Sequence, residues 1–244
     1  MRRRFFVDRF ESDSAILRGD PAEHLGRVLR AEAGQLYELS DGERVWLAKV
    51  NSVELPKRRE SRIEFALVEP IAATQPRLQI DLLLSIVKFD RFEWCLEKAT
   101  ELGATSIAPL AAARSDKPLI AAAQKRHERW AKILVESAQQ SRRLKPPALA
   151  EAESAGKVFA GSRAEPKILL SERRDAPSLR DRLSSGSGVG RVALAIGPEG
   201  GWTDEELAAA SNAGFAECSL GENILRTETA VIAALAILAY ALND

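Results

Sequence analysis

Two glycine-containing segments in the last third of the chain carry the residue types best suited to binding a small molecule. The first, at 197–201, reads Gly-Pro-Glu-Gly-Gly and follows the apolar run 192–196, which predicts a buried strand. Glycine leaves main-chain donors and acceptors accessible, and ligands of α/β folds bind outside the carboxyl ends of strands. The second segment, Leu220 to Ala230, runs into a predicted helix whose first N–H groups lack intrahelical partners. Together the two segments predict a ligand site.

The second segment also contains Arg226, followed by Thr227, Glu228 and Thr229. A capped helix start explains the threonines and the glutamate without a ligand, because hydroxyls accept hydrogen bonds from free N–H groups and carboxylates favour the positive helix end. Arg226 needs another explanation, since a guanidinium beside a glycine loop suits an anion or developing negative charge. For the first segment, a tight turn without a ligand stays an alternative.

Several common kinds of site find no support in the sequence. The loop at 197–201 contains neither G-x-G-x-x-G nor G-x-x-x-x-G-K-[ST], so dinucleotide and nucleoside-triphosphate binding are unsupported. No G-x-S-x-G motif indicates a hydrolase. The two histidines, His24 and His127, and the two cysteines, Cys95 and Cys218, show no zinc-ligand spacing, so we expect no metal.

Positive charge is concentrated between Arg114 and Lys145. This stretch has nine Lys or Arg residues against three carboxylates, in a chain whose formal net charge is zero. A solvated helix face explains such a run, and phosphate binding is the alternative.

Size and composition indicate a globular protein of one large or two modest domains, at 244 residues with 45% hydrophobic content. Two cysteines are too few for a disulfide framework and favour a reducing compartment. The apolar stretch at the N-terminus is too short for a signal peptide, and the longest one, at 230–242, is shorter than a bilayer span. We therefore expect a cytoplasmic protein without a membrane segment.

The elements that would position these residues fall into two groups. Residues 1–72 predict a small barrel, because short strands at 4–7, 14–17, 35–39, 45–53 and 63–68 surround a single helix at 22–30 and a hairpin turn at Asp41-Gly42. A polar stretch at 71–76 predicts a linker.

After residue 76 strands and helices alternate, which predicts a mainly parallel α/β sheet. Strands are predicted at 78–87, 106–110, 167–170, 192–196 and 215–220. Helices are predicted at 90–102, 124–140 and 227–242, and from Thr203, where Glu206 completes a capping box. Residues 173–191 have little apolar pattern and predict a loop.

The ordered motifs of the chain resemble the SPOUT superfamily of knotted methyltransferases. Within it they resemble the family that methylates N3 of a uridine in bacterial 16S ribosomal RNA. The matching segments are 4–7, His24-Leu25, 28–30, Asp41-Gly42, Lys88, 91–93, 97–103, Pro109-Leu110, Arg114-Ser115, Arg129-Trp130, Gln140-Ser141, Arg143, Pro146, 196–202 and 220–230. Each segment alone is weak evidence for the family, but together the segments occur in the family's order over most of the chain.

This resemblance implies an α/β fold in two domains. Residues 1–72 would form a PUA-like RNA-binding β-barrel, and residues 73–244 a SPOUT methyltransferase domain with a C-terminal trefoil knot. The implied cofactor is S-adenosyl-L-methionine, the implied partner is the 16S rRNA of the small ribosomal subunit, and the implied assembly is a homodimer. The cofactor-binding residues implied by the match are Leu170, Ser171, Glu172, Ile196, Gly197, Pro198, Glu199, Gly200, Gly201, Leu220, Gly221, Ile224, Leu225, Arg226 and Thr229.

For the reaction we expect Arg226 and Arg143 to stabilise the negative charge that develops on the uracil ring. Glu199 is a candidate for the base or for an orienting group at the cofactor, although an ordinary carboxylate is a weak base for an imide. The candidate RNA contacts are Arg2, Arg4, Arg9, Arg30, Lys88, Arg114, Arg142 and Arg143.

The chain departs from the family pattern at two positions. Arg142 stands where the family often has glycine, and Phe89 follows Lys88 where the family favours glycine. Two alternatives stay open: a SPOUT ribose 2′-O-methyltransferase, and a non-catalytic RNA-binding protein of ribosome assembly.

Overall fold

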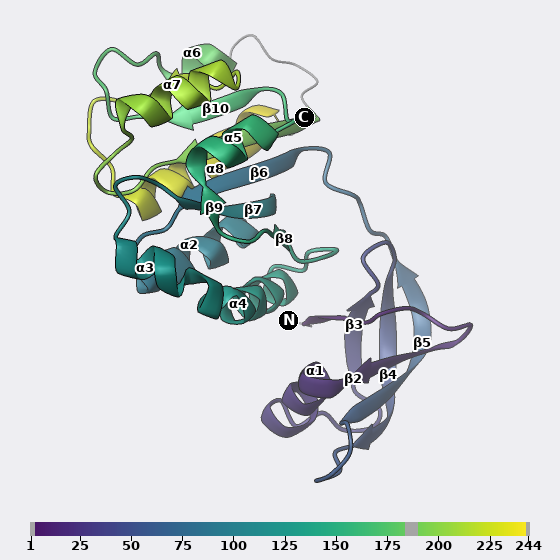
Figure 1. Cartoon of the computed structure of the whole chain (residues 1–244). Helices are drawn as coiled ribbons and strands as arrows, with labels where there is room; N and C mark the ends of the chain where they lie inside the picture. The colour runs from purple at the N-terminus through teal and green to yellow at the C-terminus, as the bar shows by residue number, and fades with distance from the viewer. Residues whose placement is uncertain (1–2, 184–189, 243–244) are drawn as a thin grey trace. The chain divides into compact units, whose positions relative to one another are not determined.

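The computed structural model describes residues 3–183 and 190–242, and the chain divides into two compact units (Figure 1). The small unit comprises Met1–Gln75 together with Ala138–Pro146, and the large unit comprises Pro76–Ser137 with Pro147–Asp244. The small unit therefore includes a segment from the middle of the chain as well as the N-terminal residues. Arg2, a predicted RNA contact, lies outside the described residues.

The small unit is built on a five-stranded sheet in the order β1-β3-β4-β5-β2. Its strands are β1 (Arg4–Phe6), β2 (Ser14–Arg18), β3 (Leu36–Ser40), β4 (Val45–Glu54) and β5 (Arg62–Ile71). Strands β3 and β4 form the predicted antiparallel hairpin, in which the Asp41 carboxylate accepts hydrogen bonds from the N–H groups of Glu43 and Arg44 at 3.0 and 2.7 Å. Phe5, Leu39 and Phe65 form part of its core, each fully buried.

The N-terminal helical region of the small unit differs from its prediction at 22–30. It begins earlier, as α1 (Gly19–Glu23), and continues as a π-helical turn, His24–Val28. The spacing of the apolar residues predicts that Ala22 and Leu25 face the core. It does not distinguish a π-helical turn from an α-helical one.

The large unit contains the predicted parallel sheet, in the order β12-β10-β11-β6-β7-β8, with β9 pairing beside β7. Every pair of neighbouring strands in it is parallel. The strands are β6 (Gln79–Ser85), β7 (Ala104–Ala111), β8 (Ala148–Leu149), β9 (Glu153–Ser154), β10 (Lys167–Leu170), β11 (Arg191–Ile196) and β12 (Ala216–Cys218). The fold is thus an α/β fold with a mostly parallel sheet.

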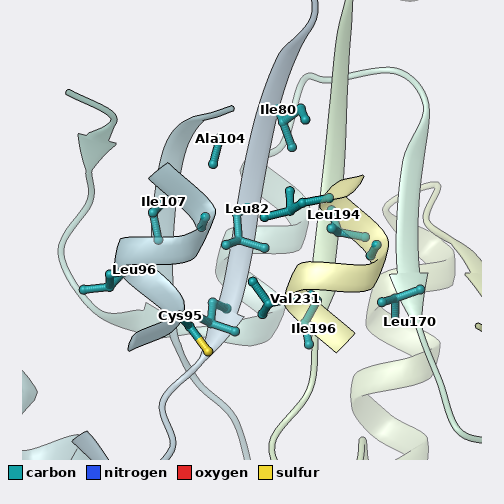
Figure 2. Packing of buried hydrophobic residues seen from close by; sticks show 14 of the residues in the cluster. Ile80, Leu82, Cys95, Leu96, Ala104, Ile107, Leu170, Leu194, Ile196 and Val231 are labelled. Atoms are coloured by element: carbon teal, nitrogen blue, oxygen red, sulfur yellow. The ribbon is translucent and has the colours of Figure 1, made fainter. Parts of the chain in front are cut away.

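Helices cover both faces of this sheet, which explains why β6 and β11 are mostly apolar. They are α2 (Phe89–Glu101), α3 (Lys117–Ala123), a 3₁₀ turn (Gln124–Arg126), α4 (His127–Gln140), α5 (Ala155–Gly161), α6 (Leu179–Leu183), α7 (Asp204–Asn212) and α8 (Thr227–Leu242). On one face Leu82 and Leu194 belong to one buried cluster with residues of α2 and α8, among them Cys95, Leu96 and Val231 (Figure 2). On the other face, residues of β10 and β11 pack with Phe159 of α5 and Ala210 of α7.

Several short elements were not predicted. Helix α3 begins with Lys117-Pro118 and is seven residues long, so it offers little periodicity. Strands β8 and β9 have two residues each, below the length at which alternation is visible. The prediction of a loop across 173–191 is wrong at Leu179–Leu183, which forms α6 around a single buried leucine, and at Arg191, which begins β11.

Cys95, on α2, lies in the core of the large unit and is fully buried (Figure 2). Burial, with a smaller contribution from the Glu228 carboxylate, raises the pKa of Cys95 from 9.0 to about 12. Because the thiolate is the reactive form, we expect iodoacetamide at pH 8 to leave Cys95 unmodified in the folded protein and to alkylate it in urea, as peptide mass spectrometry would detect. Equal alkylation in both states would contradict this burial. Between pH 9 and pH 12 the Cys95 thiol binds fewer protons in the unfolded chain than in the folded protein. The contribution of Cys95 to the free energy of unfolding should therefore fall as the pH rises through that interval.

Candidate functional site

Three neighbouring strands of the large unit end side by side at one edge of the sheet. Leu170, the last residue of β10, pairs in register with Ile196 of β11 and with Cys218 of β12. The loops that follow these strands therefore start next to one another, at the carboxyl edge where ligands of parallel sheets bind. Two of these loops, at 197–201 and 220–230, were predicted as ligand segments from their residues, and the third, at 170–172, was implied by the resemblance.

The three loops surround one cavity of about 520 Å³, a volume suited to a nucleoside-sized ligand. Of the predicted cofactor-binding residues, those that line it are Leu170, Ser171, Glu172, Ile196, Gly197, Pro198, Glu199, Gly201, Leu220, Gly221, Ile224, Leu225 and Arg226. Gly200 and Thr229 do not line it, although both belong to the same segments. The structure thus brings thirteen of the fifteen predicted residues to one cavity.

Trp202 anchors the loop at 197–201, which follows β11. Its indole N–H donates a hydrogen bond to the Leu170 carbonyl at 2.9 Å, which joins the loop after β11 to the end of β10. The buried ring also packs over Gly197, where a Cβ atom would lie only 3.0 Å from the indole. Gly197 is therefore needed for close packing against Trp202, and not only for access to a ligand.

Arg114 and Glu172 hold the rest of this loop. The Arg114 guanidinium donates to the Gly200 carbonyl at 2.8 Å, and a Cβ at Gly200 would lie 3.2 Å from the Arg114 side chain. Gly201 has a φ of +69°, a left-handed conformation that glycine adopts without strain, and its missing Cβ faces a Glu172 carboxylate oxygen at 3.0 Å. Arg114, predicted as an RNA contact, thus also forms part of the cavity wall.

Two helices begin at the cavity. Thr203 and Glu206 form the predicted capping box at the start of α7, and the Glu206 carboxylate also accepts a hydrogen bond from the Ala113 N–H at 2.8 Å. At the start of α8, the Thr227 hydroxyl lies 3.4 Å from the Gly197 carbonyl oxygen, as a donor to it. The Thr227 contact ties the loop after β11 to the segment that enters α8.

The charged side chains of the site differ in whether they have an ion-pair partner. Glu199 forms an ion pair with Arg91 of α2 at 2.7 Å, and the same guanidinium lies 4.0 Å from Glu228. Arg226 is exposed at the cavity wall and, within residues 3–183 and 190–242, has no ion-pair partner. The Arg226 charge is therefore not compensated by a carboxylate among the described residues, whereas the Glu199 carboxylate is already paired.

The remaining predicted residues belong largely to the small unit. Arg143 lies there and is partly buried, and this burial lowers the pKa of its guanidinium from the usual value. Arg9, Arg30 and Arg142 are exposed, whereas Arg4 is buried and paired with Glu38. Lys88 is exposed in the large unit, at the N-terminal end of α2.

Sequence reasoning missed several residues that define the site. Trp202 is the last residue of the matched segment 196–202. The sequence pattern around it does not indicate that its N–H reaches Leu170, which is 32 positions away. Arg91 was noted within a motif without a role, and its partner Glu199 follows 108 positions later. The other cavity residues without a predicted role are Arg173, Asp204, Leu207, Glu222, Asn223, Thr227 and Ala230.

Metal sites and membrane-spanning helices find no support in residues 3–183 and 190–242. No group of three or more His, Cys, Asp or Glu side chains there is arranged to hold a metal ion. Among the helices in the same ranges, none combines the length and the apolar character that crossing a membrane requires.

The chain is similar to known RNA methyltransferases. A model of the RNA methyltransferase domain matches residues 74–239. The ribosomal RNA small subunit methyltransferase E of Synechocystis sp. is 34% identical over 218 residues, covering 87% of this chain and 68% of the relative. The crystal structure of the ribosomal RNA small subunit methyltransferase E of Neisseria gonorrhoeae, bound to S-adenosylmethionine, is 31% identical with a TM-score of 0.84 over 98% of both chains. A methyltransferase of Legionella pneumophila in complex with the same cofactor is 28% identical with a TM-score of 0.84, covering 100% of this chain and 99% of that one.

Proposed function

We propose that this chain, which belongs to the RNA methyltransferase family and within it to the ribosomal RNA small subunit methyltransferases E, transfers a methyl group from S-adenosylmethionine to N3 of a uridine in 16S ribosomal RNA. The observation that carries this proposal is the cavity at the ends of β10, β11 and β12, because its lining consists of the three loops expected to hold that cofactor. Its volume and its glycine-rich, partly polar wall fit a ligand of this size.

The chemistry requires that an imide nitrogen lose its proton before it attacks. S-adenosylmethionine supplies a methyl group already activated on a sulfonium, so the protein acts mainly by positioning and electrostatics. Negative charge spreads from N3 onto O2 and O4 of the uracil as the proton leaves. The Arg226 guanidinium at the cavity wall, which has no ion-pair partner in the part of the chain that the structure describes, suits that charge. We assign a second such role to Arg143.

For Glu199 the ion pair with Arg91 favours the orienting role over that of the base. A carboxylate held by a guanidinium fixes the position of its loop, and here the loop is a wall of the cofactor cavity. The proton then has another acceptor, which the RNA substrate or water can supply.

We further propose that the two parts of the chain have separate tasks. Residues 1–72 would form a PUA-like RNA-binding barrel, and residues 73–244 the SPOUT domain, with the segment after β12 threaded as a trefoil knot. A small β-rich unit with exposed Arg9 and Arg30 supports the first assignment. The position of the 220–226 loop beside the loops after β10 and β11 supports the second. With Lys88, Arg142 and Arg143, the exposed arginines would contact RNA phosphates, and the uridine would have to be splayed out to react.

The chain should also form a homodimer through α2 and α8. These helices pack together, and they carry Trp94, Ile237 and Tyr240, whose exposed fractions are 40%, 39% and 91%. Exposed apolar side chains of this size are typical of interfaces. We expect sedimentation to give twice the 26.7 kDa chain mass, and Tyr240→Asp to shift the protein towards the monomer. A monomeric wild-type protein would contradict this assembly.

The direct test of the activity is transfer of radiolabelled methyl groups from S-adenosylmethionine to purified ribosomal subunits. We expect label in 16S rRNA when small subunits are the substrate and none when large subunits are offered. A cytoplasmic location follows from such a substrate. If calorimetry detects no binding of S-adenosylmethionine, the alternative of a non-catalytic ribosome-assembly protein replaces the proposal.

A further inference from the structure

The segment 138–146 is held in the small unit by side chains of two N-terminal strands. The Ser40 hydroxyl, at the end of β3, donates a hydrogen bond to the Leu144 carbonyl at 2.6 Å. The Arg4 guanidinium, from β1, donates to the Arg142 carbonyl, also at 2.6 Å. Two main-chain acceptors on either side of Arg143 are therefore fixed by residues more than 100 positions away.

Arg4 is itself fixed by a buried ion pair. Its Nε and Nη2 atoms donate to one Glu38 carboxylate oxygen at 3.2 and 2.9 Å, and both residues are more than 90% buried. The other carboxylate oxygen of Glu38 lies 3.8 Å from the Arg142 guanidinium. Since one planar guanidinium joins Glu38 and the Arg142 carbonyl, Arg4 links β1, β3 and the inserted segment. This burial leaves Arg4 poorly exposed for the RNA contact predicted from the sequence.

The turn that Arg4 holds has a backbone conformation that arginine rarely adopts. Arg142 has a φ of +55°, and the Arg143 N–H donates to the Ala138 carbonyl at 2.9 Å. This pattern is the Schellman motif that ends a helix, here α4, and its left-handed position is usually glycine. The conformation of Arg142 determines the direction in which the chain leaves α4, and therefore the position of the Arg143 backbone.

We propose that Arg4 and Glu38 are positioning residues that hold the Arg142 turn in its left-handed conformation, and thereby set Arg143 for its action on the target uridine. The inference rests on the proposed function and extends it. The unit proposed to bind RNA also fixes a guanidinium that acts on the base, so RNA docking and charge stabilisation are linked by one buried ion pair.

The first test compares Arg142→Gly with Arg142→Val on small ribosomal subunits. Both variants lack the arginine side chain, so any RNA contact it makes is lost in both, and they differ in the ability to adopt a positive φ. We expect kcat of the valine variant to be at least about tenfold below that of the glycine variant, with equal affinity for S-adenosylmethionine. Equal kcat values, or a loss of cofactor affinity that accompanies the loss of kcat, would overturn the proposal.

The second test replaces Glu38 by glutamine, with Glu64→Gln on β5 as the matched control. Each change removes one carboxylate charge from the small unit, but only Glu38 is joined to the turn. We expect Glu38→Gln to lower kcat by a factor about ten times larger than the factor by which KM for the RNA changes. We expect Glu64→Gln to leave both kcat and KM near their wild-type values. A parallel change in both variants would refute the assignment. Failure of the wild-type protein to methylate uridine would instead refute the proposed function.

Discussion

Arg226→Ala should lower methyl transfer to 16S rRNA about 100- to 1,000-fold while changing the affinity for S-adenosylmethionine less than about threefold. Arg226 lines the cavity, is exposed, and within the described residues has no ion-pair partner. Its charge is thus available to the uracil anion that forms during the reaction, whereas cofactor binding relies on the surrounding backbone and glycines. Single-turnover rates and calorimetric titrations measure the two quantities separately.

Arg226→Lys is the control for charge, and we expect it to recover part of the rate, because lysine keeps the cation without the planar fork. Arg143→Ala in the same assays should reduce the rate in the same direction. If Arg226→Ala reduces cofactor affinity as much as the rate, Arg226 is a binding residue and the role proposed for it is wrong.

Gly197→Ala should weaken the binding of S-adenosylmethionine by about tenfold or more. The added Cβ would lie 3.0 Å from the Trp202 ring, closer than non-bonded atoms pack. That ring has little room to move, because it is buried and its N–H is bonded to the Leu170 carbonyl. Relief of the contact would displace the loop after β11 from the end of β10, where two walls of the cavity meet. Calorimetry measures the change.

Gly161→Ala provides the matched control in the same unit. A Cβ at Gly161 would meet no atom within 4 Å, so the same chemical change is made where space is open. We expect this variant to bind the cofactor as the wild type does. Wild-type affinity in Gly197→Ala would show that the contact with Trp202 does not shape the cavity.

Much of the large unit was predictable because its sequence signals are local. A nearly continuous apolar run predicted β6 and a shorter apolar run predicted β11, and helices cover both strands on both faces. The capping box at Thr203 and the helix at 227–242 were likewise readable from adjacent residues, and the structure confirms both. The cavity loops could be located for the same reason, since glycine-rich segments follow these strands directly.

The contacts that complete the site are distant in sequence, and local patterns do not reveal them. Arg4 was predicted as an RNA contact, but its guanidinium is bound by Glu38 and the Arg142 carbonyl. Arg114 was assigned to RNA from its charge, whereas its guanidinium holds the Gly200 carbonyl. In each case a partner 34 or more positions away determines what the charged side chain does.

Nucleoside mass spectrometry identifies the atom that the protein methylates. Small ribosomal subunits lacking the modification would be incubated with the protein and S-adenosylmethionine, and their 16S rRNA digested to nucleosides. We expect 3-methyluridine with the wild-type protein, and far less of it after the same incubation time with Arg226→Ala. Appearance of a 2′-O-methylated nucleoside instead, or of no methylated product with cofactor-bound protein, would contradict the proposed function.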